Sequence, residues 1–138
     1  MTTVANYVVI EGDTTLGTLG DGDPTYAKTF DTPDYNGEDA VISLMVSGLT
    51  AATSSVRVRV NTFDIGEIFP YRYAGFSDRE EVSEHKFTQT IVISASILDA
   101  VNPNTLEITA VGFPEASPGN SLDNFALRDI VCFYKLNV

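Results

Sequence analysis

The sequence predicts an all-β fold, an antiparallel β-sandwich with one short helical turn. Three observations support this prediction. Most apolar segments show the period-two alternation, or the enrichment in β-branched and aromatic residues, that is typical of strands. Clusters of Gly, Pro, Asn and Asp separate these segments at intervals, as turns do. The chain has 138 residues, 43% of them hydrophobic, which suits a single domain over residues 1–138 with one hydrophobic core.

In the first third of the chain, the first predicted strand covers residues 6–10. A Gly- and Asp-rich stretch, residues 11–24, follows and is interpreted as one or two turns. The next predicted strand, residues 26–30, ends in a turn region that contains Asn36-Gly37, a strong turn signal because both residues tolerate positive φ. Residues 40–46 form an apolar run that is too short for a helix, so we expect a core strand there.

The clearest half-buried strand is Val56-Arg57-Val58-Arg59-Val60, where the valines share one face and the arginines share the other. Residues 63–69 continue it, with Asp64-Ile65-Gly66 as a kink or a tight turn. Two interpretations of the arginines stay open. They pair with carboxylates on an adjacent strand, as cross-strand charges often do, or they bind a carboxylate ligand or an acidic neighbouring subunit.

The second half contains three more predicted strands, together with the helical turn and two loops, residues 71–84 and 114–120. Residues 71–84 are the longest polar connection. Residues 94–101 are the expected helical turn, which begins at Ser94 as a cap and ends at Asn102-Pro103. The strands cover residues 86–93, 105–111 and 127–138.

The charge balance limits the partners that we expect. Nineteen Asp and Glu face eight Lys and Arg, for a net charge of −11. Binding to nucleic acid or to an anionic membrane depends on Lys and Arg, so we expect neither partner. The sequence shows no apolar run long enough to span a bilayer and no signal-peptide pattern at its start. We therefore expect a cytoplasmic protein or part of an assembled particle, unless a leader is missing from this sequence.

Three blocks of the second half resemble the galactose-binding-like β-sandwich superfamily. Residues 56–61 with 64–68 are similar to its "V-x-V-N-G-x-x-V-G" hairpin, with Thr62 in place of the usual glycine. Residues 90–98 and 102–108 resemble its strand, short turn and "G-x-N-T-L-x-I" strand, with Pro103 and no glycine. Residues 125–134 are similar to its closing strand. The resemblance implies a jelly-roll sandwich for residues 55–138, and it implies a fold better than an activity.

An aromatic loop is the predicted ligand-binding site. Aromatic rings stack on sugars or on partner side chains, and aromatics with Arg are enriched at interface hot spots. The alternative is that these rings fold back over the edge of the core. The resemblance implies carbohydrate as the ligand and loops at the end of the sandwich as its contacts. The predicted ligand-binding residues are Tyr71, Arg72, Tyr73, Phe76 and Arg79.

Clustered carboxylates suggest a structural Ca²⁺ site, because hard oxygen ligands suit this ion. The early acidic loop supplies Glu11, Asp13, Asp21 and Asp23, and the resemblance implies Asp123 or Asp129 near the closing strand as partners. The spacing does not match an EF-hand, and turn-forming aspartates are the alternative explanation. The predicted metal ligands are Asp13, Asp21, Asp23 and Asp123.

The sequence does not favour an enzyme. It has one cysteine, Cys132, in an apolar segment, and one histidine, His85, so a Cys–His pair is not favoured. The acidic run that contains Glu80, Glu81 and Glu84 is typical of a solvated face. Two functions remain: a non-catalytic recognition module with a carbohydrate or protein partner, and a structural subunit that self-associates in a phage particle, tail-like apparatus or surface appendage.

Overall fold

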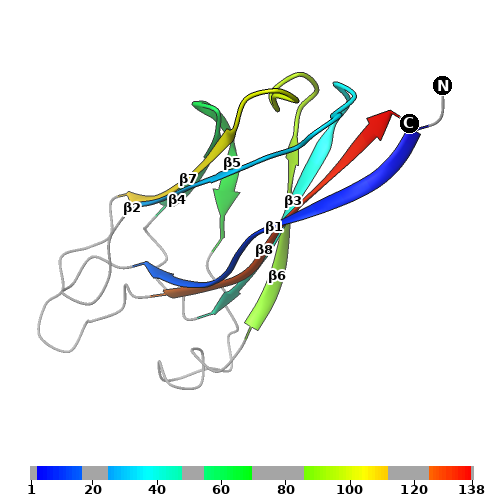
Figure 1. Cartoon of the computed structure of the whole chain (residues 1–138). Helices are drawn as coiled ribbons and strands as arrows, with labels where there is room; N and C mark the ends of the chain where they lie inside the picture. Colours follow the sequence, from blue (N-terminus) through cyan, green and yellow to red (C-terminus); the bar gives the residue numbers. More distant parts are fainter. Residues whose placement is uncertain (1–2, 17–24, 48–54, 70–85, 112–124, 138) are drawn as a thin grey trace, which may run out of the picture.

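The computed structural model describes residues 3–16, 25–47, 55–69, 86–111 and 125–137. They form eight β-strands in two antiparallel sheets that pack face to face (Figure 1). This confirms the predicted all-β sandwich. The strands are β1 (Thr3–Leu16), β2 (Thr25–Phe30), β3 (Ala40–Ser47), β4 (Ser55–Val60), β5 (Phe63–Ile68), β6 (Lys86–Ile93), β7 (Asn104–Val111) and β8 (Phe125–Asn137).

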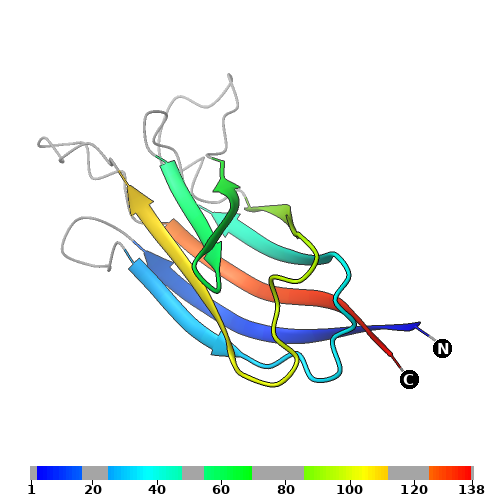
Figure 2. The same ribbon diagram turned by 90° about the horizontal axis from the view of Figure 1, so that it is seen from above.

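The strand order shows a chain that crosses repeatedly between the two sheets. Sheet A has the order β1-β8-β3-β6 and sheet B the order β2-β7-β4-β5. Among the described strands, only β4 and β5 are both consecutive in the chain and neighbours in one sheet. Such alternation between two sheets is how a jelly roll is built. The first and last strands, β1 and β8, lie side by side in sheet A (Figures 1 and 2).

The core lies between the inner faces of the two sheets. It is formed by the alternate residues of each strand that point inward. In β3, alternate residues from Ala40 to Val46 are buried while their neighbours are half-buried. The valines of β4 are buried and its arginines face away from the core, as predicted. β-Branched and aliphatic side chains at these positions fit a pleated, close-packed interior. The described part of the chain contains no helix with the length and hydrophobicity that crossing a bilayer requires.

Strand β1 is longer than the sequence predicted. Residues 11–16, which were expected to form turns, continue the strand to Leu16 and pair with β8 as far as Phe125. The pairing shifts by one residue between Val9 and Glu11, so Ile10 stands in a bulge. The hydrogen-bond ladder of the partner strand outweighs the local preference of Gly and Asp for turns, because strand formation depends strongly on context.

The tight turn of the β4–β5 hairpin lies at Asn61 and Thr62, whose φ angles are +50° and +72°. Positive φ at both central residues is the geometry of a type I′ turn, which Asn tolerates well and Thr does not. The sequence predicted either a kink or a tight turn at Asp64-Ile65-Gly66. They form the kink, since the register shifts between Arg59–Asp64 and Val58–Gly66 and leaves Ile65 as a bulge.

The predicted helical turn over residues 94–101 is wrong, because the described chain forms turns and bends there. Ser96 has a φ of +69°, which no right-handed helix accommodates. Side chains satisfy the backbone instead. The Asp99 carboxylate accepts hydrogen bonds from the amides of Val101 at 2.8 Å and Asn102 at 2.9 Å. Asp commonly competes with helix formation in this way.

A buried polar network ties together the three connections at this end of the sandwich. The side chain of Asn61 donates to Ile97 O at 2.8 Å and to Asn104 Oδ1 at 2.8 Å, and it accepts from Thr105 N at 2.9 Å. Asn104 in turn donates to Thr32 Oγ1 at 2.9 Å. Because every member is satisfied, the network fixes the hairpin, the turn after β2 and the β6–β7 connection to one another.

Candidate recognition site

The strand ends that flank connections 17–24, 48–54, 70–85 and 112–124, one from each of the eight strands, gather at one end of the sandwich, away from Thr3 and Asn137 (Figure 2). In sheet A, Leu16 pairs with Phe125, and Ser47 pairs with Ala126 and Lys86. Sheet B has the same arrangement, since the starts of β2 and β4 meet the ends of β5 and β7. This end of the sandwich therefore carries the connections 17–24, 48–54, 70–85 and 112–124.

The predicted ligand-binding residues belong to the third of these connections. Tyr71, Arg72, Tyr73, Phe76 and Arg79 lie outside the described residues, so their role stays a prediction. The described residues do fix where this connection begins and ends. It leaves β5 after Ile68 in sheet B and enters β6 at Lys86 in sheet A. β5 and β6 are edge strands of their sheets, so this connection starts and ends at the same edge of the sandwich.

A groove of about 490 Å³ runs along this edge between the two sheets. Its size falls in the range of small-ligand sites. The groove is open rather than enclosed, and its lining is mostly apolar with a few polar groups. The lining residues are Gly66, Glu67, Phe69, Gln89, Thr90, Ile91 and Val92.

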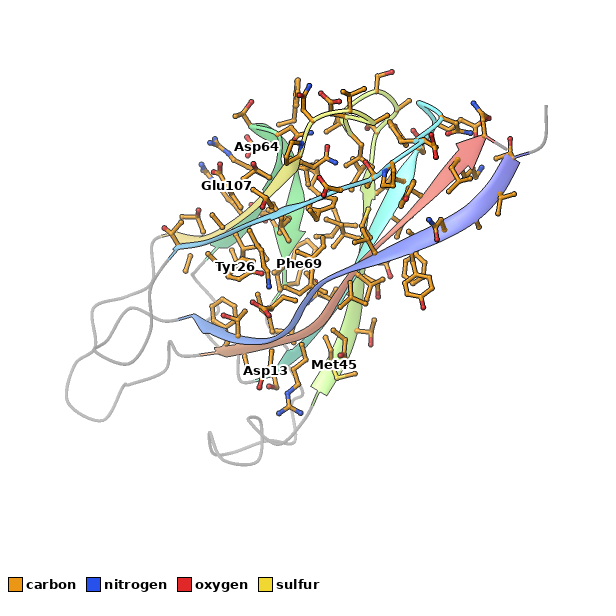
Figure 3. The ribbon with its side chains drawn as sticks, viewed as in Figure 1. Asp13, Tyr26, Met45, Asp64, Phe69 and Glu107 are labelled. Atoms are coloured by element: carbon orange, nitrogen blue, oxygen red, sulfur yellow. The ribbon has the colours of Figure 1, made fainter. Side chains whose placement is uncertain are left out.

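Phe69 and Gln89 define the end of the groove that lies nearest the connection. The Gln89 side chain donates to Phe69 O at 2.8 Å and accepts from Phe69 N at 3.0 Å. These two bonds hold the backbone of residue 69 against β6, while Phe69 stays 64% exposed at the position labelled in Figure 3. An exposed ring on a fixed backbone is a preorganised stacking surface.

The middle of the groove depends on Gly66. A Cβ atom built on this residue would lie 3.0 Å from Ile91 Cγ2, closer than side chains normally approach. Glycine therefore allows β5 to approach β6 across the gap between the sheets. The opposite edge of the sandwich is closed by polar contacts, since Glu11 accepts from Tyr26 Oη at 3.4 Å and pairs with Lys28 at 3.4 Å. Burial and the Glu11 charge raise the pKa of Tyr26.

The predicted metal ligands do not meet within the described residues. Asp13 lies on β1 and pairs with Arg128 of β8 at 3.6 Å. Asp21, Asp23 and Asp123 lie outside the described residues. In the described ranges, no three His, Cys, Asp or Glu side chains come together in a way that could hold a metal ion. The Ca²⁺ site stays a prediction that depends on the early acidic loop.

The arginines of β4 face solvent on the outer side of sheet B. Arg59 donates to Asp64 of β5 at 2.7 Å, and this hydrogen bond raises the pKa of the guanidinium. Arg57 stands opposite Glu67 in the same ladder. The cross-strand interpretation is confirmed for Arg59. Its pair is exposed, so we expect it to contribute little to stability.

Cys132 is buried in the core, as its apolar segment predicted. Burial raises the pKa of its thiol to about 12, so the reactive thiolate is scarce at neutral pH. We expect Ellman's reagent at pH 8 to leave the folded protein unlabelled over hours and to label one thiol within minutes in denaturant. Rapid labelling of the folded protein would show that the strand around Cys132 opens or that the thiol is activated.

The comparisons with known proteins show a fold and no family. No protein-family model matches the chain, and no curated protein matches its sequence. Among solved structures, the chain is similar to part of dimeric latent PorU from Porphyromonas gingivalis, with a TM-score of 0.58 and 11% identity over 99% of this chain. It also matches part of a family GH115 4-O-methyl-α-glucuronidase with specificity for decorated arabinogalactans, with a TM-score of 0.47 and 16% identity over 93% of this chain.

These similarities show the β-sandwich fold alone, because identity is low and the second TM-score is too small to support an argument. The chain spans 13% of the PorU chain and 17% of the glucuronidase chain. A sandwich of this size therefore occurs as one part of a much longer protein.

None of the seven groove residues was among the predicted site residues, including Phe69 and Gln89. Phe69 lies two residues before Tyr71 of the aromatic loop, which is a signal that the sequence does carry. The position of Gln89 was less visible, since its partner lies twenty residues away and the bonds are to backbone atoms.

Proposed function

We propose that this protein is a non-catalytic recognition module that binds carbohydrate where the β5–β6 groove meets the 70–85 connection. One observation carries the proposal: a preorganised aromatic ring, Phe69, opens onto a groove of ligand size beside the connection that contains Tyr71, Arg72 and Tyr73. The resemblance of the second half to galactose-binding-like domains points to the same class of ligand.

The chemistry of the groove suits a neutral sugar. Pyranose rings present C–H faces that stack on aromatic rings, and their hydroxyls bond to planar polar side chains. Phe69 supplies the ring, and Glu67 and Thr90 supply polar groups along the lining. The Glu67 carboxylate and the net charge of −11 disfavour uronates and other acidic sugars.

Calorimetric titration with a panel of neutral and acidic oligosaccharides tests this proposal. We expect at least one neutral sugar to bind, and we expect Phe69→Ala and Tyr71→Ala each to weaken binding about tenfold, the usual effect of losing an aromatic hot spot. The matched control is Phe63→Ala, which removes a similarly exposed aromatic residue at the start of β5 that does not line the groove. Its affinity should stay within about twofold of the parent.

Three results would contradict the proposal. The first is no heat with any sugar, and the second is equal loss in the Phe69 and Phe63 variants. The third is release of reducing ends from the panel, which would show catalysis.

A further inference from the structure

The outer face of sheet B carries two cross-strand rows of outward-facing side chains. Figure 3 shows Asp64 and Glu107 of the second row on this side of the sandwich. The second row has a carboxylate on each side of its arginine, whereas the first row has one on only one side. The register gives the first row as Thr25, Thr109, Arg57 and Glu67, and the second as Ala27, Glu107, Arg59 and Asp64.

The two arginines of β4 differ in the partners of their guanidinium groups. Arg59 donates to Asp64 at 2.7 Å. Arg57 takes part in none of the ion pairs of the described residues, although Glu67 is its cross-strand neighbour. Both Arg57 and Glu67 are exposed. The donors of Arg57 and the acceptor oxygens of Glu67 are therefore available to a molecule that lies over both.

A hollow of about 290 Å³ lies on this face and is lined by Arg57, Asp64, Gly66 and Glu67. Gly66 and Glu67 also line the β5–β6 groove, so the hollow and the groove adjoin at the same two residues of β5. Because β5 is the edge strand of sheet B, one ligand can pass from the groove over this strand to the hollow. The volume of the hollow is at the small end for ligand sites, which suits one unit of a longer ligand.

From this continuity we infer that the hollow is a second subsite of the sugar site, and that the ligand is a neutral oligosaccharide of at least two units rather than a single sugar. The inference rests on the proposed carbohydrate-binding function. One unit stacks on Phe69 at the groove, and a following unit places its hydroxyls at Arg57 and Glu67. Phe69 lies two residues beyond Glu67, about 7 Å along an extended chain, so the ring and the polar pair contact different parts of the ligand.

The chemistry of the polar pair suits the hydroxyls of a neutral sugar. A hydroxyl both donates and accepts hydrogen bonds, so neighbouring hydroxyls can accept from Arg57 and donate to Glu67 at the same time. Hydrogen bonds to charged groups are stronger than those between neutral groups. An acidic sugar fits less well, because Glu67 and Asp64 lie beside the one arginine of the hollow and repel another carboxylate.

Calorimetric titration of the full chain with sugars of increasing length tests the inference. The probes are galactose, glucose and mannose, each as the single sugar and as its β-1,4-linked disaccharide and tetrasaccharide. We expect the best tetrasaccharide to bind at least about tenfold more tightly than its single sugar, because the second subsite adds charge-assisted hydrogen bonds. Arg57→Gln should abolish this gain and leave the affinity for the single sugar within about twofold of the parent.

The matched control is Arg59→Gln. It removes the same charge from the same face of β4, two residues away, at a residue that does not line the hollow. The gain with length should persist in this variant. Phe69→Ala, in contrast, should weaken the binding of single sugars and of tetrasaccharides alike, since its ring belongs to the first subsite.

Several results would overturn the inference and leave sugar binding at the groove standing. They are single sugars that bind as tightly as the tetrasaccharides, a gain with length that survives Arg57→Gln, and an equal loss of that gain in Arg59→Gln. Tighter binding of tetragalacturonate than of any neutral tetrasaccharide would overturn it as well, because Arg57 would then act as an anion site. An absence of binding by every probe would contradict both the inference and the proposed function.

Discussion

Replacing Asn104 with alanine is expected to destabilise the fold by about 3 to 5 kcal/mol, the largest effect of any polar substitution in the described residues. Asn104 is fully buried. Its Nδ2 donates to Phe30 O at 3.4 Å, Thr32 Oγ1 at 2.9 Å and Asp99 O at 3.3 Å. Its Oδ1 accepts from Asp99 N at 2.7 Å and Asn61 Nδ2 at 2.8 Å.

The size of the effect follows from what the alanine leaves behind. The partner groups of Asn104 stay in place beside a cavity, and each buried donor or acceptor without a partner costs about 1 to 3 kcal/mol. Urea unfolding, monitored by circular dichroism, measures the change in the free energy of unfolding. The matched control is Asn102→Ala in the same connection, which removes one exposed bond to Asp99 at 3.1 Å. That variant should lose less than about 1 kcal/mol, and equal losses would contradict the network.

Replacing Leu127 with alanine is expected to cost about 3 to 4 kcal/mol. Leu127 is fully buried on β8, which lies between β1 and β3 in sheet A. Truncation removes apolar contacts and opens a cavity that neighbours in a regular sheet cannot collapse to fill, because both flanking ladders hold β8 in place.

The same unfolding measurement, with Leu136→Ala as control, checks this prediction. Leu136 lies on the same strand but is only partly buried, at the margin of the core. Its truncation should cost about 1 kcal/mol, since less apolar surface returns to water. A loss at Leu127 no larger than the loss at Leu136 would mean that the interior around β8 is loosely packed.

The sequence was sufficient for the strands whose period-two pattern is strong. β4 and β6 have the alternation that was predicted, because one face of each must be apolar for the sheets to pack. β3 lies where the apolar run over residues 40–46 predicted a core strand. The second half of β1 was missed because its residues have no strand preference of their own. They are extended by pairing with β8, a partner more than one hundred residues away.

The site was less predictable for a similar reason. Asn61 and Asn104 matched the asparagines of the two family motifs in the sequence. Their hydrogen bond to each other, however, is apparent only in the structure. The outward-facing side of β1 and β8 was also hidden. Tyr7-Val8-Val9 and Val131-Cys132-Phe133 are apolar at successive positions, so both faces of these strands are apolar and alternation gives no sign of which face is outside.

The pairing of Thr3 with Asn137 has a consequence for the geometry of the whole module. The chain enters and leaves the sandwich about one strand spacing apart, near 4.8 Å. Any polypeptide joined to both strands would therefore be attached to the sandwich at one place, where β1 begins and β8 ends. The end of the sandwich where residues 70–85 connect β5 to β6 is opposite that attachment point. Attachment of the module through its termini would therefore leave this end accessible from solution.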